Sequence, residues 1–162
     1  MQNIQVKKDL AAKTIQITRS FKAPLNKVWR AFTEKELLDQ WWGPQPWRAE
    51  TKHMDFREGG YWLYAMVGPE GEKHWSRADF QTIEPMISIK GKDGFCDENG
   101  TMNTEMPVTE WTNVFTETAE GTTVTNTLLF ESEKDLQTMV DMGFEQGYSM
   151  GLNQLEALLD SM

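Results

Sequence analysis

The chain has 162 residues, a length typical of one domain, and its formal net charge of −9 comes from 16 basic and 25 acidic residues. Such an acidic field repels phosphate backbones and anionic lipid surfaces, so we expect neither nucleic-acid binding nor membrane insertion. A single cysteine, Cys96, excludes an intrachain disulfide, and no apolar run suits a signal peptide or a membrane span. We therefore expect one cytoplasmic domain over residues 1–162, with about the first 12 residues loose.

The first clear pattern is the alternation of apolar and polar residues in 14–21, which predicts a strand. Arg19 lies on the apolar face of this strand, where a charge must be paired or sit at a wet opening. Two interpretations are open. Arg19 either anchors a ligand carboxylate or phosphate, or forms a structural ion pair with a carboxylate such as Asp55.

Helical spacing of apolar residues follows Ala23-Pro24 and continues to residue 40. Asn26 is the expected N-terminal cap, and the helical region is predicted to break near Thr33. Gly43-Pro44 ends it. The sequence therefore predicts two short helices directly after the first strand.

Short alternating runs separated by turn residues fill the middle of the chain, from Trp47 to Phe130. The segment Gly91-Lys92-Asp93-Gly94 is interpreted as one of the turns. An antiparallel meander is the simplest arrangement, with strands near 47–55, 60–67, 73–84, 86–92, 108–117 and 121–131.

A long amphipathic helix is predicted for residues 132–160, starting at a capping pair formed by Ser132 and Asp135. Three glycines recur at four-residue spacing along one flank of this helix. They either permit close approach to the sheet or leave space vacant; they are Gly143, Gly147 and Gly151.

Several motifs in this order resemble the START-like family related to the activator of the ninety-kilodalton heat-shock chaperone ATPase. The resemblance covers about residues 14–160. It rests on ITRSFKAPLNKVWRAFTEKELLDQWWGP, on the Asp55-to-Gly60 turn, on Met66, Pro69 and Gly71 in the next hairpin, and on GFCDENG, GTTVT and the Gly147-Tyr148 pair. In the last pair, Tyr148 stands where the family more usually has tryptophan.

The resemblance implies an α+β helix-grip fold, in which an antiparallel sheet of six or seven strands curves round the long C-terminal helix. It also implies a cavity for a small hydrophobic or aromatic molecule between sheet and helix. Two alternatives stay open. One is a cyclase- or hydrolase-type enzyme that uses the same cavity, and the other is a co-chaperone that binds the chaperone itself.

Candidate cavity residues are mostly aromatic, and no metal site or cofactor is expected because the two histidines have no ligating neighbours in sequence. His53 is the one candidate acid or base, although a solvent-facing or core histidine is the more frequent case. The expected ligand-binding residues are Arg19, Trp42, His53, Trp62, Tyr64, Met66, Trp111, Phe115, Phe144, Gly147 and Tyr148.

Overall fold

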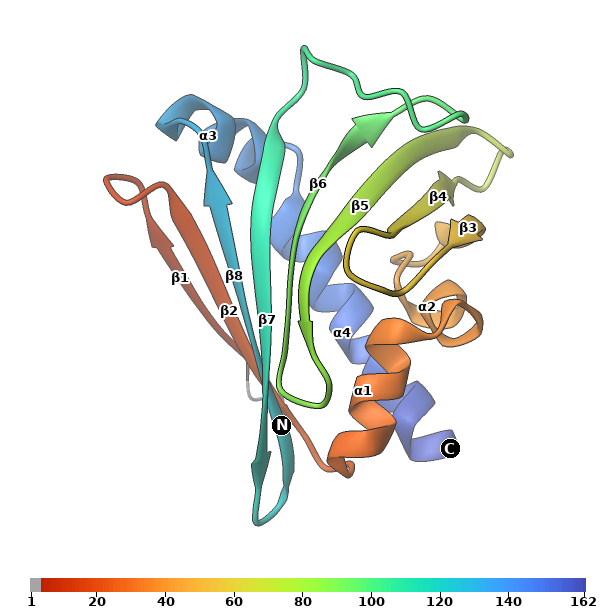
Figure 1. Ribbon diagram of the computed structural model, residues 1–162, viewed down its shortest axis with the longest axis vertical. Helices are drawn as coiled ribbons and strands as arrows, with labels where there is room; N and C mark the ends of the chain where they lie inside the picture. Colours follow the sequence, from red (N-terminus) through yellow and green to blue (C-terminus); the bar gives the residue numbers. More distant parts are fainter. Residues whose placement is uncertain (1–3) are drawn as a thin grey trace.

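The structure, a computed structural model that describes residues 4–162, contains one eight-stranded antiparallel sheet (Figure 1). The strand order is β1-β2-β8-β7-β6-β5-β4-β3, so the strands from β3 to β8 form a meander and β8 then pairs with β2. The strands are β1 (Ile4–Asp9), β2 (Thr14–Phe21), β3 (Arg48–Met54), β4 (Tyr61–Val67), β5 (Lys73–Glu84), β6 (Ser88–Cys96), β7 (Val108–Thr118) and β8 (Gly121–Phe130).

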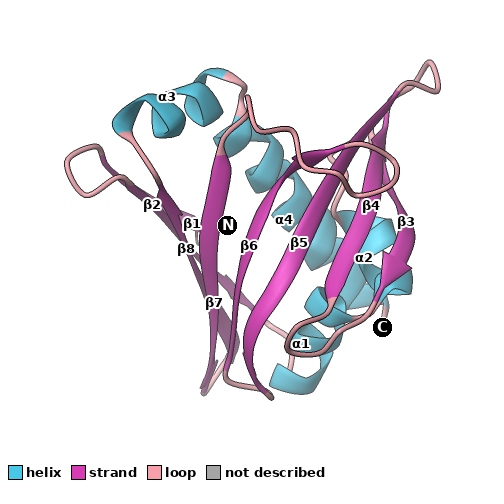
Figure 2. Ribbon diagram, turned by 45° about the horizontal axis from the view of Figure 1, so that its top comes forward, coloured by secondary structure: helices cyan, strands magenta, loops and turns pink. Residues whose placement is uncertain are grey.

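Four helices complete the fold: α1 (Leu25–Thr33), α2 (Lys35–Trp41), α3 (Glu133–Asp141) and α4 (Phe144–Ser161). Figures 1 and 2 show α4 running across one face of the curved sheet, with α1 and α2 beside it. The main-chain oxygen of Met162, just beyond α4, accepts a 2.9 Å hydrogen bond from the Lys27 ammonium of α1. None of the helices in residues 4–162 has the length and apolar character needed to cross a membrane.

The inner face of the sheet is buried because its strands alternate as the sequence predicts. Ile15, Ile17 and Phe21 of β2 are almost fully buried, and their neighbours on the opposite face are half-exposed. Burying this apolar face against the helices supplies most of the stabilisation of such a sheet. The antiparallel meander, the helix break after Thr33 and the Ser132 cap are confirmed; the Ser132 hydroxyl accepts a 3.1 Å hydrogen bond from the Asp135 amide.

Three boundaries differ from the prediction. Residues 4–9, expected to be loose, pair with β2 as an edge strand. The strand expected to end at residue 92 continues to Cys96, so Asp93 lies within a strand and not in a turn. The predicted single C-terminal helix is interrupted at Gly143, whose φ of 83° lies in the left-handed region that favours glycine.

The start of α1 also differs from the prediction. Pro24, and not Asn26, precedes the first helical turn, and no side chain caps it. Proline fits this place because its fixed φ suits a helix start and its missing N–H would have no partner there. Asn26 lies inside the helix.

Candidate functional site

Arg19 is 1% exposed, which makes it the only basic residue among the buried residues of the described chain. Its guanidinium crosses from β2 to α4, donating to Asn153 Oδ1 at 2.9 Å and to Glu156 Oε2 at 3.1 Å. Asp55, the partner suggested from the sequence, instead pairs with Arg57 at 2.6 Å. Arg19 is thus a structural link between sheet and helix, although its Nε has no partner in the described structure.

Five aromatic side chains from β4, α4 and the residue that follows α2 meet between the helices and the sheet. We call this set the Trp42 cluster: Trp42, Trp62, Tyr64, Phe144 and Tyr148. Trp62 and Tyr64 stack with ring centroids 4.1 Å apart, and Trp42 meets both rings edge-on. The Trp42 indole N–H donates to the Tyr64 hydroxyl at 3.0 Å. The sequence prediction had placed these five residues at one site, and the structure brings them together.

Three members of the Trp42 cluster keep accessible surface. Trp42, Phe144 and Tyr148 are half-buried, whereas Trp62 and Tyr64 are buried beneath them. Phe144 and Tyr148 stack on the first turns of α4 with centroids 5.6 Å apart, and Tyr148 meets Trp42 at 6.0 Å. Burial nevertheless raises the pKa of the Tyr148 phenol, so its surroundings are apolar even where surface remains open.

A hydrogen-bonded chain behind the Trp42 cluster fixes Trp62. The Trp62 indole N–H donates to Thr51 Oγ1 at 3.0 Å, and the Thr51 hydroxyl donates to Asp39 Oδ1 at 2.6 Å. Partial burial raises the pKa of Asp39, and the hydrogen bonds from Thr51 oppose this rise. The wall formed by Trp62 is therefore held from α2 and β3.

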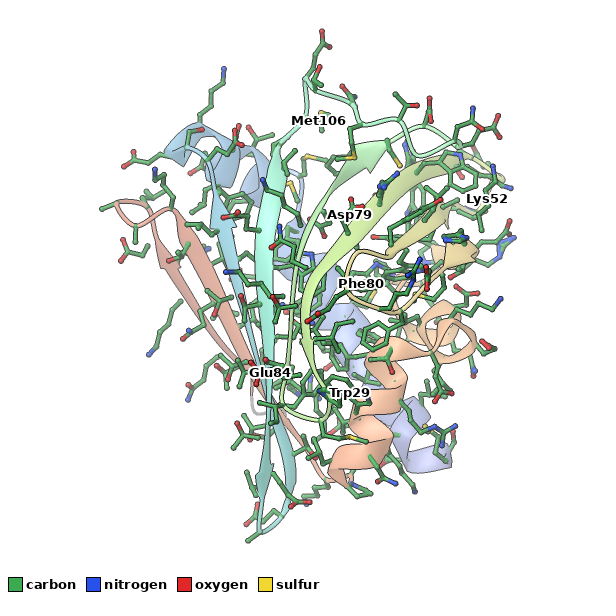
Figure 3. All side chains as sticks on the ribbon, in the orientation of Figure 1. Trp29, Lys52, Asp79, Phe80, Glu84 and Met106 are labelled. Atoms are coloured by element: carbon green, nitrogen blue, oxygen red, sulfur yellow. The ribbon has the colours of Figure 1, made fainter. Side chains whose placement is uncertain are left out.

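The other two aromatic candidates belong to a second cluster beneath α1. Phe115 meets Trp29 at 5.0 Å, and Phe56 connects Trp29 to Phe80, two residues labelled in Figure 3. Trp111 joins the cluster through Phe80, at 6.4 Å. Phe115 is 5% exposed and fills the core.

Trp111 differs from Phe115 because it brings a polar atom into the interior. Its indole Nε1 is buried and has no hydrogen-bond partner in the described structure. The ring lies across the neighbouring strand β6, where a Cβ on Gly91 would come within 2.6 Å of Trp111 Cζ2. Glycine at this position thus permits the close approach. Buried N–H groups without an acceptor are rare in folded proteins.

Asp93 lies on the same face of β6 as Gly91, two residues further on. Its cross-strand partners, Ala78 and Thr109, are each 5% exposed, so the carboxylate faces the interior. Desolvation raises the pKa of Asp93 to about 7, yet the side chain keeps some accessible surface.

The sequence prediction missed Asp93 because the two glycines beside Lys92 and Asp93 suggested a turn. A signal was present: Ile89, Gly91 and Asp93 alternate with Lys90 and Lys92, which is strand periodicity. Glycine within a strand often marks close approach of another group, as Trp111 does here.

Three predicted site residues lie at the margin of this region or outside it. His53 is exposed, because a bulge after Thr51 shifts the register of β3, and its ring lies tilted over Tyr61 with centroids 4.4 Å apart. Met66 is half-buried on the inner face of β4, opposite His74. A Cβ at Gly147 would meet only Pro44 Cγ at 3.7 Å, so this glycine does not bring α4 into close contact with the sheet.

Two surface hollows stand out in residues 4–162, and neither is lined by the Trp42 cluster. The larger, of about 630 Å³, lies between β1 and α3 and is bordered by Lys7, Leu10 and Val140. No group of three or more His, Cys, Asp or Glu side chains in the described residues is arranged to hold a metal ion. Trp111 and Asp93 each bring a polar group to the inner face of the sheet.

The sequence and the structure were compared with known proteins. Protein Ms6760 from Mycobacterium smegmatis is 36% identical, with a TM-score of 0.89 and 96% of each chain covered. A protein from Arthrobacter aurescens is 34% identical, with a TM-score of 0.91 and coverage of 98% of this chain and 92% of that one. A Staphylococcus epidermidis protein is 34% identical, with a TM-score of 0.85 and coverage of 97% and 94%. Comparison with proteins of curated function gives no match.

The family model described as activator of Hsp90 ATPase homolog 1-like protein matches residues 22–160. This range extends from the end of β2 through most of α4. It thus includes both aromatic clusters and Asp93. The chain belongs to the activator of Hsp90 ATPase homolog 1-like family, with the helix-grip fold.

Proposed function

We propose that the protein binds a small hydrophobic or aromatic molecule between the inner face of the sheet and α4, with the Trp42 cluster as one wall. The carrying observation is the buried Trp111 indole N–H without an acceptor in the described structure, on an inner face that also carries the aromatic ring of Phe80. A bound molecule with an oxygen or nitrogen acceptor would satisfy it.

The accessible rings of the Trp42 cluster support placing the entrance of the proposed binding site beside α4. Trp42, Phe144 and Tyr148 keep accessible surface although they are large and aromatic. Covering this surface with an apolar ligand removes it from water, which favours binding. Gly147 lies one residue before Tyr148, and its missing side chain leaves room beside Pro44. The flank of α4 at the cluster is therefore not tightly packed.

Native mass spectrometry of the protein purified from its own host tests the proposal directly. The expected result is a retained small molecule that dissociates on denaturation. Isothermal titration calorimetry with 2-naphthylmethanol, a neutral aromatic probe, provides a second measurement. A protein that retains no small molecule and binds no aromatic probe would refute the proposed function.

The variant Trp42→Ala locates the site. It should weaken probe binding by about 1–3 kcal/mol while the protein stays folded, because a half-buried wall residue loses ligand contacts. Trp75→Ala is the matched control, since Trp75 lies on the outer face of β5 beneath the ammonium groups of Lys52 and Lys73. Severe unfolding with unchanged affinity in the folded fraction would show that Trp42 belongs only to the core.

A further inference from the structure

Building on this proposed function, we propose that the bound molecule carries a basic nitrogen, and that its ammonium group lies against the Asp93 carboxylate inside the aromatic interior. The proposal names a class of ligand, an apolar or aromatic amine. It assigns to Asp93 a role that none of the expected site residues has.

The placement of Asp93 is the first step. Neighbouring residues on β6 face the other side of the sheet: Lys92 lies 3.9 Å from Glu110 on the outer surface. Asp93 itself stands between Ala78 of β5 and Thr109 of β7, both buried. Its carboxylate is thus directed into the interior by strand alternation, and a change of register would be needed to expose it.

The second step is that Asp93 has no partner. Its carboxylate makes no hydrogen bond or ion pair with any residue in 4–162, and no hydrogen bond from the protein offsets its desolvation. A desolvated carboxylate is ordinarily paired or hydrogen-bonded, because removing its hydration without compensation is costly. An ammonium group supplies both the opposite charge and the hydrogen-bond donors.

The other charged groups described in the interior do not pair with Asp93, so its carboxylate is available to a ligand. Arg19 of β2 is already bound by Glu156 and Asn153 of α4. Lys8, on the inner face of β1 opposite Ile15, lies 3.7 Å from Glu145 of α4. Other titratable groups that face the interior include the phenols of Tyr64 on β4 and Tyr148 on α4, with His74 at the exposed end of β5. None of them makes a hydrogen bond or ion pair with Asp93 in the described structure.

The rings around Asp93 suit a cation as well as an apolar body. Tyr64 lies close enough that the negative charge of Asp93 adds to the effect of burial in raising the pKa of its phenol. Trp111 lies across Gly91, on the same face of β6 as Asp93. Tyrosine and tryptophan rings attract an ammonium through their electron-rich faces, and more strongly where water is excluded.

The test compares three probes that share a naphthalene ring and differ in head group: 2-naphthylmethylamine, 2-naphthylmethanol and 2-naphthoate. Calorimetric titration at pH 7.5 should give the amine the highest affinity, about tenfold or more above the alcohol, and the acid the lowest. In Asp93→Asn the amine should lose this advantage, while the alcohol should bind as before. Glu110→Gln is the matched control, because it removes one negative charge from the outer face at the neighbouring register position.

The outcomes separate the two proposals. Binding of the alcohol without preference for the amine, or an amine preference that survives in Asp93→Asn, would overturn the inference and leave the proposed function intact. Tightest binding of naphthoate would also overturn it, and would favour the alternative that Arg19 anchors a ligand carboxylate. Binding of none of the three probes would refute the proposed function itself.

Discussion

Replacing Asp93 by Asn should stabilise the ligand-free protein at high pH and much less at low pH. The folded protein raises the pKa of Asp93 from 3.8 to about 7. An acid with a raised pKa favours folding when protonated, so its contribution is fully present below about pH 4 and is lost as pH rises towards and through 7. At about 1.4 kcal/mol for each pKa unit, the whole effect is at most about 4 kcal/mol.

Most of this loss falls between pH 5 and pH 8, where at most about 3 kcal/mol is expected. Because the Asp93 side chain keeps some accessible surface, we expect about 1–2 kcal/mol to be measured. Urea unfolding of wild type and Asp93→Asn at the two pH values gives the difference. Other groups facing the interior, such as His74 and Glu156, are present in both proteins and cancel in the comparison. A stability gap that is equal at pH 5 and pH 8 would refute the reasoning.

Three substitutions and one control test the packing of α4 and its N-terminal end, each by urea or thermal unfolding. Gly147→Ala should stabilise the protein by up to about 1 kcal/mol, since its Cβ meets only Pro44 and alanine favours the helix; destabilisation would show hidden close contact. Gly143→Ala should instead cost about 1 kcal/mol, because φ is 83° there although no atom blocks the Cβ; a neutral result would contradict this. Glu156→Gln should cost about 1–2 kcal/mol by removing the charge that pairs with buried Arg19, whereas Glu34→Gln, at an exposed pair, should cost less than about 0.5 kcal/mol.

The grouping of aromatic residues within one element of the candidate site was predictable, because strand alternation and helical spacing show which residues share a face. Trp62, Tyr64 and Met66 lie on one face of β4 as expected. The pattern did not show that Phe115 packs against Trp29 of α1, whereas Trp111 meets Phe80 of β5. Which rings meet depends on where the helices lie on the sheet, and residue spacing within one element does not determine that.

Long-range pairing was the less predictable part. Glu156, the partner of Arg19, is 137 residues away along the chain, and several carboxylates were equally plausible partners. β1 was missed because its lysines and short length resemble a loose terminus, although charged side chains are common on edge strands. Asp93 was missed because glycine serves both tight turns and close approach within a strand, and only the position of Trp111 decides between them.

The pairing of β8 with β2 also sets an order on how the chain reaches its native state. Partners in this ladder, such as Phe21 and Thr122, are separated by α1, α2 and five strands, whereas each pair from β3 to β8 joins neighbours in sequence. Local hairpins form faster than contacts that close a long loop, so the meander is expected to assemble before β2 joins it. During synthesis, β2 therefore emerges early with only its neighbour β1 to pair with, and its other edge stays unpaired until β8 has left the ribosome.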